Sequence, residues 1–411
     1  MQDSKIIRNV DFFVGKLACR ALSWIRKPSG FRSNQSIKMT QGPQKVLMIE
    51  LFEMGSAVML APSITYLKKQ NPQVEIHALT TQSCAPIWEA LGSLDPNNVH
   101  VIESGTPLNF IWSALKTIFR LRKNRFDLII DYELFMRVPA IFSGLLKGTR
   151  RGGFYKYDYE GLYRGSFYEA KCAYNQNSHI SRNYLALTKT TYENPNASPN
   201  YKGLILDTEI SVTPSIKKTP VKELTDRPYI AICADVGPTL SVRNYPREHF
   251  AEVIEELLGL NPDYQVVFIG TEEDRSTAEI ILSKIGQKER CKNFCGKTNF
   301  RGLLDVISGA DLLITNDNGP GHFATLTGTK TLALFSTDSP YVYGPLGKTV
   351  IAYTHYQCSP CISALNHKRT PCTDNQCLKT LNPSRVVQLS QALLKGTARF
   401  GTINNEISYL T

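Results

Sequence analysis

The sequence lacks any run of about 18 consecutive apolar residues, the length that a membrane-spanning helix needs. Cysteine is scarce, with 10 in 411 residues, and the 27 glycines and 22 prolines form no periodic repeat. These shortages exclude a disulfide-stapled miniprotein and a collagen. The composition, with 42% hydrophobic residues, is that of a globular chain, and its length predicts about two to three domains. We therefore expect a soluble or peripheral protein.

Acidic residues are outnumbered, and the imbalance is local. The chain carries 47 Lys and Arg against 36 Asp and Glu, a net charge of +11. Residues 1–42 hold eight basic and two acidic residues, so they supply +6 and residues 43–411 only +5. Aromatic residues do not alternate with a basic stripe, which disfavours nucleic acid as a partner.

Residues 1–42 also carry an amphipathic pattern. Apolar side chains recur at helical spacing at Ile6, Val10, Phe13, Leu17, Ala21 and Trp24. Lys16 and Arg20 interrupt the apolar stretch, which disfavours a secretory signal peptide. Two interpretations stay open: the helix lies on an anionic bilayer with Trp24 near the headgroups, or it packs on its own domain. Residues 27–42 resemble a linker.

From residue 43 on, strand and helix patterns alternate in two blocks. Apolar runs typical of buried strands open the blocks, KVLMIELF at residue 45 and YIAICADV at residue 229, and helical patterns separate further runs. This alternation predicts an α/β fold of two facing, doubly wound Rossmann-like domains. The chain then divides into an N-terminal domain (43–192), a proline-rich linker (193–228), a C-terminal domain (229–390) and a tail (391–411).

One glycine-rich turn carries the clearest chemistry. The segment 315–328, TNDNGPGHFATLTG, follows a buried strand and leads into a helix. Glycines let backbone N–H groups approach a ligand, and a helix N-terminus favours an anion, so Gly319 to His322 could cradle a phosphate. The alternative is a tight strand-to-helix turn capped by Asp317. The turn is neither a Walker loop nor the dinucleotide GxGxxG motif.

Several motifs in order resemble glycosyltransferase family 9, the lipopolysaccharide heptosyltransferases. SGADLLITNDNGPGH (308–322) and LALFSTDSP (332–340) are similar to the family's Asp-x-Gly-x-x-His turn and the strand after it. RNYPREHF (243–250), CGKTNFRGLLDVI (295–307) and ELFEMGSAVMLAP (50–62) resemble three further family elements. The ordered set is far more specific than any single motif.

The resemblance implies the GT-B fold, an inverting mechanism without a catalytic metal, and a sugar donor held by the C-terminal domain. Asp317 would meet the donor sugar. The residues that it implies around the donor diphosphate are Asn318, Gly319, Pro320, Gly321 and His322. Arg243 would contact the same diphosphate, where negative charge develops as it leaves.

The nucleotide's other end would lie on two further loops. Glu272 or Glu273, at a strand end after Gly270, would accept hydrogen bonds from the ribose hydroxyls. Lys297 and Thr298 would lie near the base.

The opening turn of the first domain departs from the family pattern. The residue after Gly55 is an Asp that acts as general base in the heptosyltransferases, and here it is Ser56. Glu53, on the same turn, takes over that role if the loop aims it at the acceptor; otherwise it is a solvent-exposed strand-end glutamate. Glu50 stands where the family has a basic acceptor-side residue, which argues against an inner-core Kdo acceptor.

Four cysteines and one histidine complete the candidates. Cys358, Cys361, Cys372 and Cys377 have the spacing of a structural zinc knuckle, or they are incidental thiols of a loop. His179 either lines the site or caps a helix.

These observations predict a glycosyltransferase that transfers a sugar, such as heptose from ADP-heptose, to lipopolysaccharide or another envelope glycan. We expect it in the cytoplasm, peripheral on the inner face of the cytoplasmic membrane, with a nucleotide-sugar donor and a glycolipid or saccharide acceptor. The alternatives are a family member that binds nucleotide-sugar without catalysis and, less well supported, a zinc-containing nucleic-acid-binding protein.

Overall fold

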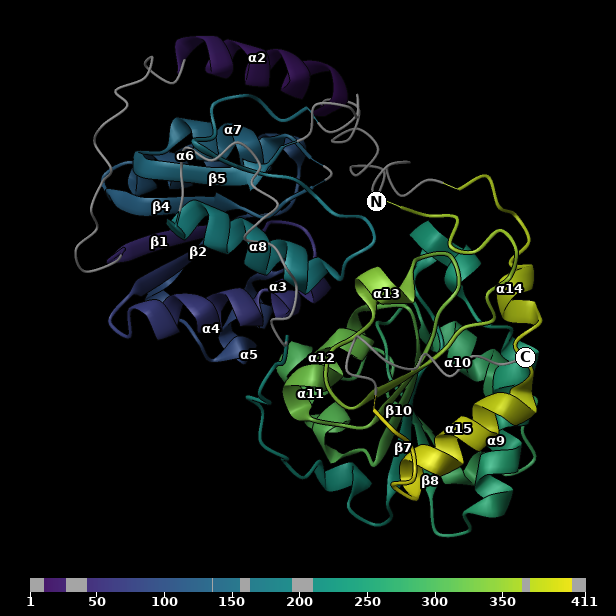
Figure 1. Ribbon diagram of the computed structural model, residues 1–411. Coiled ribbons are helices and arrows are strands. Elements are labelled where there is room, and N and C mark those ends of the chain that lie inside the picture. The colour runs from purple at the N-terminus through teal and green to yellow at the C-terminus, as the bar shows by residue number, and fades with distance from the viewer. Residues whose placement is uncertain are drawn as a thin grey trace. The chain divides into compact units, whose positions relative to one another are not determined.

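The computed structural model describes residues 11–26, 43–134, 136–155, 163–193, 210–363 and 370–400. The chain forms two compact units, Met1–Ile210 and Ser211–Thr411, so the boundary falls inside the predicted linker (Figure 1). Within the described residues, no helix has both the length and the apolar character needed to cross a bilayer.

Each unit is built on a parallel six-stranded sheet. The first has the order β3-β2-β1-β4-β5-β6 and the second the order β12-β11-β10-β7-β8-β9. The strands of the first are β1 (Lys45–Ile49), β2 (Glu75–Thr81), β3 (Val99–Ile102), β4 (Phe126–Asp131), β5 (Gly148–Phe154) and β6 (Ala170–Cys172). Those of the second are β7 (Tyr229–Cys233), β8 (Gln265–Phe268), β9 (Cys291–Asn293), β10 (Leu312–Asn316), β11 (Thr331–Leu334) and β12 (Thr349–Ala352). The predicted pair of doubly wound α/β domains is confirmed.

Helices cover these sheets. The first unit contains α2 (Lys16–Ile25), α3 (Met54–Met59), α4 (Ala61–Gln70), α5 (Ala85–Leu91), α6 (Pro107–Leu121), α7 (Val138–Leu145) and α8 (Ile180–Glu193). The second contains α9 (Arg247–Leu260), α10 (Arg275–Leu282), α11 (Phe300–Gly309), α12 (Gly319–Thr327), α13 (Pro340–Tyr343), α14 (Gln376–Lys379) and α15 (Pro383–Leu394). The helical segment after β1 is divided into α3 and α4, because Pro62 lies at the start of α4 and supplies no N–H to continue α3.

The strand order of each sheet indicates where a ligand-binding site is expected. In both sheets the chain steps outward from its first strand, then returns to the other side of it, so the order reverses between β1 and β4 and between β7 and β10. Register pairs Val46 with Leu128 and Leu312 with Ile230, which aligns the carboxyl ends of each pair. Ligands of open α/β sheets bind at the carboxyl ends of strands beside such a reversal.

The described part of the N-terminal helix packs on the first unit along one face. Cys19 is buried with Ala140 and Phe167, and Leu22 packs against this cluster. Ser23 Oγ accepts a hydrogen bond from the backbone N–H of Ser166 at 2.8 Å. For this face of the helix, the interpretation that the helix packs on its own domain is confirmed. Ile6, Val10 and the linker 27–42 lie outside the described residues.

A buried histidine pair predicts that the stability of the first unit depends on pH. His77 Nδ1 lies 2.9 Å from His100 Nε2, between β2 and β3. Burial, the neighbouring His77 and Arg120 lower the pKa of His100 from 6.5 to about 4. Between about pH 6.5 and 4, the unfolded chain therefore binds a proton at His100 that the folded chain does not bind. We expect the free energy of unfolding to fall by roughly 1–3 kcal/mol as the pH drops from 6.5 to 4.

Urea unfolding at several pH values measures this loss. The His100→Gln variant is the control, because it keeps the carboxylates that also titrate in this window and removes this imidazole. An equally steep decline in the variant and in the unaltered chain would contradict the assignment.

Candidate functional site

The glycine-rich turn lies at the carboxyl end of β10, as its sequence predicts. Asn318, and not Asp317, occupies the N-cap position of α12, and its side chain makes no capping hydrogen bond. Instead Asn318 Nδ2 donates to the carbonyl of Asp235 at 3.0 Å, and Asn318 Oδ1 accepts from Thr315 Oγ1 at 2.6 Å. The reading of Asp317 as a helix cap is thus wrong. Asn318 therefore does not cap α12, and a helix N-terminus of this kind is a favourable position for an anion.

Both glycines of this turn are crowded. A Cβ on Gly319 would lie 2.9 Å from the Phe323 ring, and one on Gly321 would lie 3.2 Å from Pro345 and 3.3 Å from Thr315. A larger side chain would therefore displace the start of α12. Backbone atoms, rather than side chains, are what these two positions present to a ligand.

Arg243 links three segments at this edge of the sheet. It ends the short 3-10 helix Pro238–Arg243 after β7, and its Nε lies 3.3 Å from Thr337 Oγ1 and 3.7 Å from Asp317 Oδ2. Its Nη2 pairs with Asp338 Oδ2. The guanidinium is thus held beside the start of α12 by carboxylates at the ends of β10 and β11. Sequence reasoning missed Asp338, although it lies in the LALFSTDSP motif.

Asn316 and Asp235 fix this arrangement. Asn316 Nδ2 donates to the carbonyl of Ala234 at 2.9 Å, and Asn316 Oδ1 accepts from the N–H of Tyr245 at 3.1 Å. Asp235 accepts from Gly237 N–H at 2.9 Å and from Thr277 Oγ1 at 2.8 Å. These bonds tie β7, β10 and the Arg243 loop together, and they were not foreseen from sequence.

The two loops predicted for the nucleoside lie next along the same edge. Gly296 N–H donates to the carbonyl of Gly270 at 3.0 Å, so the loops after β8 and β9 touch. Gly296 has a φ of +73° and faces the Glu272 carboxylate, so the turn requires glycine there. Lys297 Nζ lies 5.4 Å from the centroid of the Phe294 ring, and Thr298 precedes the Asn299 cap of α11.

Glu272 and Glu273 differ in their hydrogen-bond partners. Arg275 donates to Glu272 Oε1 at 2.6 Å and to Oε2 at 2.8 Å, and these bonds lower the pKa of the Glu272 carboxyl. Glu273 is exposed, and backbone and Thr271 hydrogen bonds lower its pKa. Both are ionised near neutral pH and able to accept from a diol.

In the first unit, Glu53 and Ser56 lie together after β1. Glu53 is the N-cap residue of α3, and Ser56 Oγ donates to Glu53 Oε2 at 2.9 Å. Glu53 is half-buried, as are Gly55 and Ser56. Glu50 is fully buried; burial first, and then the charges of Glu133, Glu53 and Asp131, raise its pKa well above normal. The geometry places a serine hydroxyl where it orients the Glu53 carboxylate.

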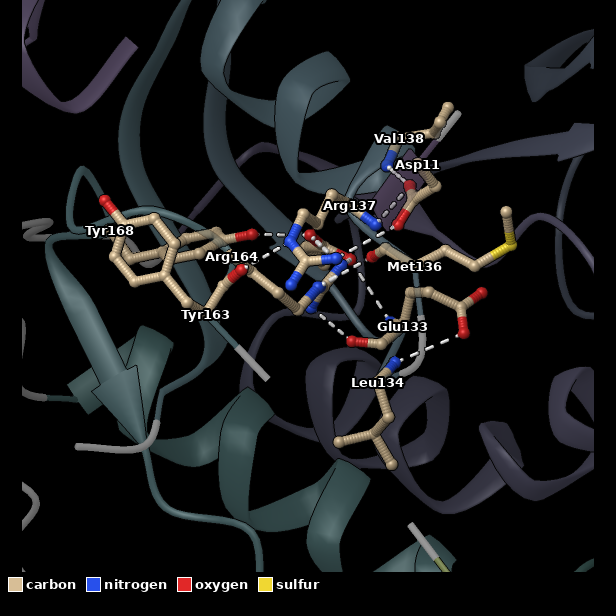
Figure 2. A network of polar contacts seen from close by, with 10 residues as sticks. Asp11, Glu133, Leu134, Met136, Arg137, Val138, Tyr163, Arg164 and Tyr168 are labelled. Atoms are coloured by element: carbon tan, nitrogen blue, oxygen red, sulfur yellow. Dashed lines mark hydrogen bonds and ion pairs between the residues drawn. The ribbon is translucent and has the colours of Figure 1, made fainter. Parts of the chain in front are cut away.

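A buried ion pair lies at the carboxyl end of β4, in the same unit as Glu53 and Ser56 (Figure 2). Arg164 Nη2 donates to Asp131 Oδ2 at 2.6 Å and to Oδ1 at 2.8 Å, and Tyr168 Oη donates to Oδ2 at 2.5 Å. Arg164 Nε also donates to the Met136 carbonyl at 2.8 Å. Burial opposes the charge of Arg164, but Asp131 outweighs it and raises the pKa of Arg164. This network was not predicted from the sequence.

The predicted zinc knuckle is not supported. Within the described ranges, no group of three or more His, Cys, Asp or Glu side chains is placed to hold a metal ion. The thiols contact other groups: Cys361 Sγ accepts from Thr370 Oγ1 at 3.3 Å, and Cys372 Sγ donates to the Asp374 carbonyl at 3.2 Å. Cys377 is buried in α14, which raises its pKa, whereas Cys358 is exposed. Matching spacing did not bring the four thiols into one coordination sphere.

His179 is buried just before α8. Its Nδ1 accepts from the N–H of Ser181 at 3.2 Å, and its carbonyl accepts from the N–H of Asn183 at 3.1 Å. This geometry favours the helix-capping interpretation.

The two sheets, each with functional loops at its carboxyl edge, define a two-domain Rossmann-like α/β protein of the GT-B class. The family model of glycosyltransferase family 9 (heptosyltransferase) matches residues 114–370, and the chain belongs to this family.

Known heptosyltransferases are similar to this chain over different shares of its length. The lipopolysaccharide heptosyltransferase 2 of Salmonella typhimurium is 30% identical over 126 residues, covering 30% of this chain and 35% of that protein. The lipopolysaccharide heptosyltransferase 1 of Campylobacter coli is 23% identical over 72% of this chain and 85% of that protein. The matches to heptosyltransferases 2 thus span only 35% to 48% of those relatives.

Solved structures share the fold. The ADP-heptose lipopolysaccharide heptosyltransferase II of E. coli superposes with a TM-score of 0.63 at 20% identity, covering 86% of this chain and 99% of that one. A family 9 glycosyltransferase from Veillonella parvula gives 0.64 at 17% identity, covering 87% and 99%.

Proposed function

We propose that this protein is an inverting, metal-independent glycosyltransferase that transfers heptose from ADP-heptose to lipopolysaccharide or another envelope glycan. The observation that carries the proposal is the glycine-rich start of α12, which the Asn318 side chain does not cap, with Arg243 beside it, in a chain that belongs to family 9. A helix N-terminus and a guanidinium are what a diphosphate leaving group requires. Relatives named as heptosyltransferases support the choice of sugar, and an E. coli heptosyltransferase solved with ADP supports the choice of nucleotide.

In the proposed reaction, residues of the first unit act on the acceptor and residues of the second unit bind the donor. Glu53 takes the proton from an acceptor hydroxyl, with Ser56 orienting its carboxylate. The acceptor oxygen attacks the anomeric carbon, the bond to the diphosphate breaks, and the configuration inverts. The diphosphate leaves with its charge held by Arg243 and the N–H groups of Gly321 and His322, while Asp317 meets the sugar hydroxyls. The ribose binds Glu272 or Glu273, and Lys297 and Thr298 lie near the base.

Thermal stabilisation by ADP-, GDP-, UDP- and dTDP-sugars tests the donor. A ligand at about 100 times its dissociation constant adds roughly 2.7 kcal/mol to the unfolding free energy. We expect the ADP-sugar to raise the melting temperature most. A larger rise with another nucleotide would overturn the assignment of ADP.

The variant Arg243→Gln tests how much Arg243 contributes to binding of the diphosphate. A hydrogen bond to a charged group contributes about 1.5–3 kcal/mol, so we expect ADP to bind roughly 10–100-fold more weakly, by calorimetry. Lys284→Gln, which removes an exposed partner of Glu248, is the matched control and should leave the affinity unchanged. Undiminished ADP affinity in Arg243→Gln would remove Arg243 from the site.

Ser56 favours a second candidate, a family member that binds nucleotide-sugar without transferring it, because it stands at the family's base position. Incubation with donor and a panel of envelope glycolipid extracts separates the two. Donor binding without transfer to any acceptor supports the second candidate.

We place this activity in the cytoplasm, on the inner face of the cytoplasmic membrane, where a lipid-linked acceptor is presented. The excess charge of residues 1–42 and the exposed Trp24 support a contact of the N-terminal helix with anionic lipid.

A further inference from the structure

The helix α6 exposes a continuous apolar face. Leu108 is 78% exposed and Trp112 75%, and the full stripe at helical spacing is Leu108, Ile111, Trp112, Leu115 and Phe119. The opposite face of α6 is buried in the core of the first unit through Ala114, Ile118 and Leu121. Packing in the core therefore accounts for the apolar residues on the inner face of α6, but not for those on the outer face. A monomer rarely exposes a contiguous stripe of large apolar side chains without a partner.

The charged side chains of α6 and of the turn after it are all basic. Residues 107–125 carry five basic side chains and no acidic one; the five, all exposed, are Lys116, Arg120, Arg122, Lys123 and Arg125. A second copy of the chain would present the same positive charge and be repelled. An apolar stripe with basic flanks and an exposed tryptophan instead matches an anionic lipid surface, which takes the apolar side chains among its acyl chains and the cations at its phosphates.

The outer face of α2 repeats this character. Trp24 is 75% exposed, and Leu17 and Ile25 are exposed with it, whereas Cys19 faces the core. Asp11, just before α2, is buried and accepts hydrogen bonds from the backbone N–H groups of Arg137 and Val138 at 2.7 and 3.0 Å (Figure 2). The helix is therefore held on the first unit with this apolar face outward.

Both helices lie on one side of the sheet. The helix α6 joins β3 to β4 and α7 joins β4 to β5, so both crossovers step in the same direction along the sheet. Right-handed crossovers in one direction put their helices on one face. The helix α2 packs on α7, and Figure 1 shows α2, α6 and α7 on the same side of β4 and β5. One side of the first unit thus bears two exposed tryptophan-containing apolar faces.

We propose that the outer face of α6 is a docking surface for an anionic lipid bilayer, separate from the N-terminal helix. Leu108, Ile111, Trp112, Leu115 and Phe119 enter the boundary between headgroups and acyl chains, and the basic residues pair with lipid phosphates. With α2 as a second contact on the same side of the sheet, the bilayer holds the first unit in a fixed orientation. Binding to lipid needs neither sugar donor nor acceptor, so it is measured independently of glycosyl transfer.

Vesicle co-sedimentation of the full chain tests the proposal. The vesicles contain phosphatidylcholine with or without phosphatidylglycerol, and the variants are Trp112→Glu/Leu115→Glu on α6 and Trp24→Glu on α2. We expect binding that requires phosphatidylglycerol, falls at least about 10-fold in the α6 variant, and falls separately in the α2 variant. Leu260→Glu, at an exposed apolar position of the second unit, is the matched control and should bind as the unaltered chain does. Point variants are preferable to deletion of residues 1–42, which would also remove Asp11.

Tryptophan fluorescence gives a second readout. The chain has three tryptophans, of which Trp88 is buried, so in Trp24→Phe a blue shift on anionic vesicles reports Trp112. Unchanged circular dichroism and melting temperature show that each variant is folded. Undiminished vesicle binding by the folded α6 variant, or no blue shift of Trp112, would overturn the proposal. So would a dimer of the unaltered chain, detected by analytical ultracentrifugation, that the α6 variant dissolves without losing vesicle binding.

Discussion

Replacing Glu53 by Gln is expected to lower turnover by about 10²–10⁴-fold and to leave the donor's dissociation constant unchanged. Gln has nearly the same size and still accepts the Ser56 hydrogen bond, but it cannot take a proton from the acceptor hydroxyl. The loss therefore appears in kcat with the true acceptor. Full turnover in this variant would show that Glu53 is not the base.

The neighbouring serine supplies a rescue experiment. Ser56 Oγ lies 2.9 Å from Glu53 Oε2, so a carboxylate at position 56 would sit close to the one at position 53. We expect Ser56→Asp to restore part of the turnover lost in Glu53→Gln, and Ser56→Ala alone to cost far less than Glu53→Gln. Failure of the rescue with intact donor binding would mean that the two positions do not share one acceptor hydroxyl.

Replacing Arg164 by Met is expected to lower the free energy of unfolding by about 3–5 kcal/mol. Asp131 has no exposed surface, and the substitution leaves its charge buried with only the hydrogen bonds of Tyr168 and Glu133 N–H. Urea unfolding of the purified chain measures the loss, read from the transition that reports the first unit.

Two variants show whether the buried charge is the cause. Arg164→Met/Asp131→Leu removes both charges and should recover much of the stability. Lys292→Met breaks an ion pair with Asp226 that is largely exposed, so it should cost far less stability than Arg164→Met. A loss in Arg164→Met no larger than in Lys292→Met would refute the role assigned to the pair.

The strands that were predicted from sequence share one property. The strand β1 is an unbroken apolar run because both faces of a parallel sheet are covered by helices. Such runs are visible without the fold. The strand β5, GTRRGGF, has no such pattern and was missed, although it is largely buried. Arg150 is accommodated there by the carbonyls of Thr191 and Tyr192 at 2.8 and 2.7 Å, groups some 40 positions away in sequence.

The candidate site divides in the same way. The turn at Gly319 to His322 was predictable because a crowded strand-to-helix turn requires glycine locally. The partners of Arg243, Asp317 and Asp338, lie in the segments that follow β10 and β11, and only the sheet order brings them together. The four cysteines show the converse, since their spacing along the chain suggested a metal site, and no group of metal ligands is found among the residues that the structure describes.

The alternation of strands and helices, the family and the glycine turn can be recognised from the sequence alone, because each depends on patterns within short segments. Which charges are buried in pairs, and which apolar side chains remain exposed, depends on tertiary packing. In α6, hydrophobic residues occur on both faces of the helix, and the sequence does not say which face the sheet will cover. Packing buries Ala114 and Ile118 and leaves Trp112 exposed, because burial is a property of contacts between distant segments.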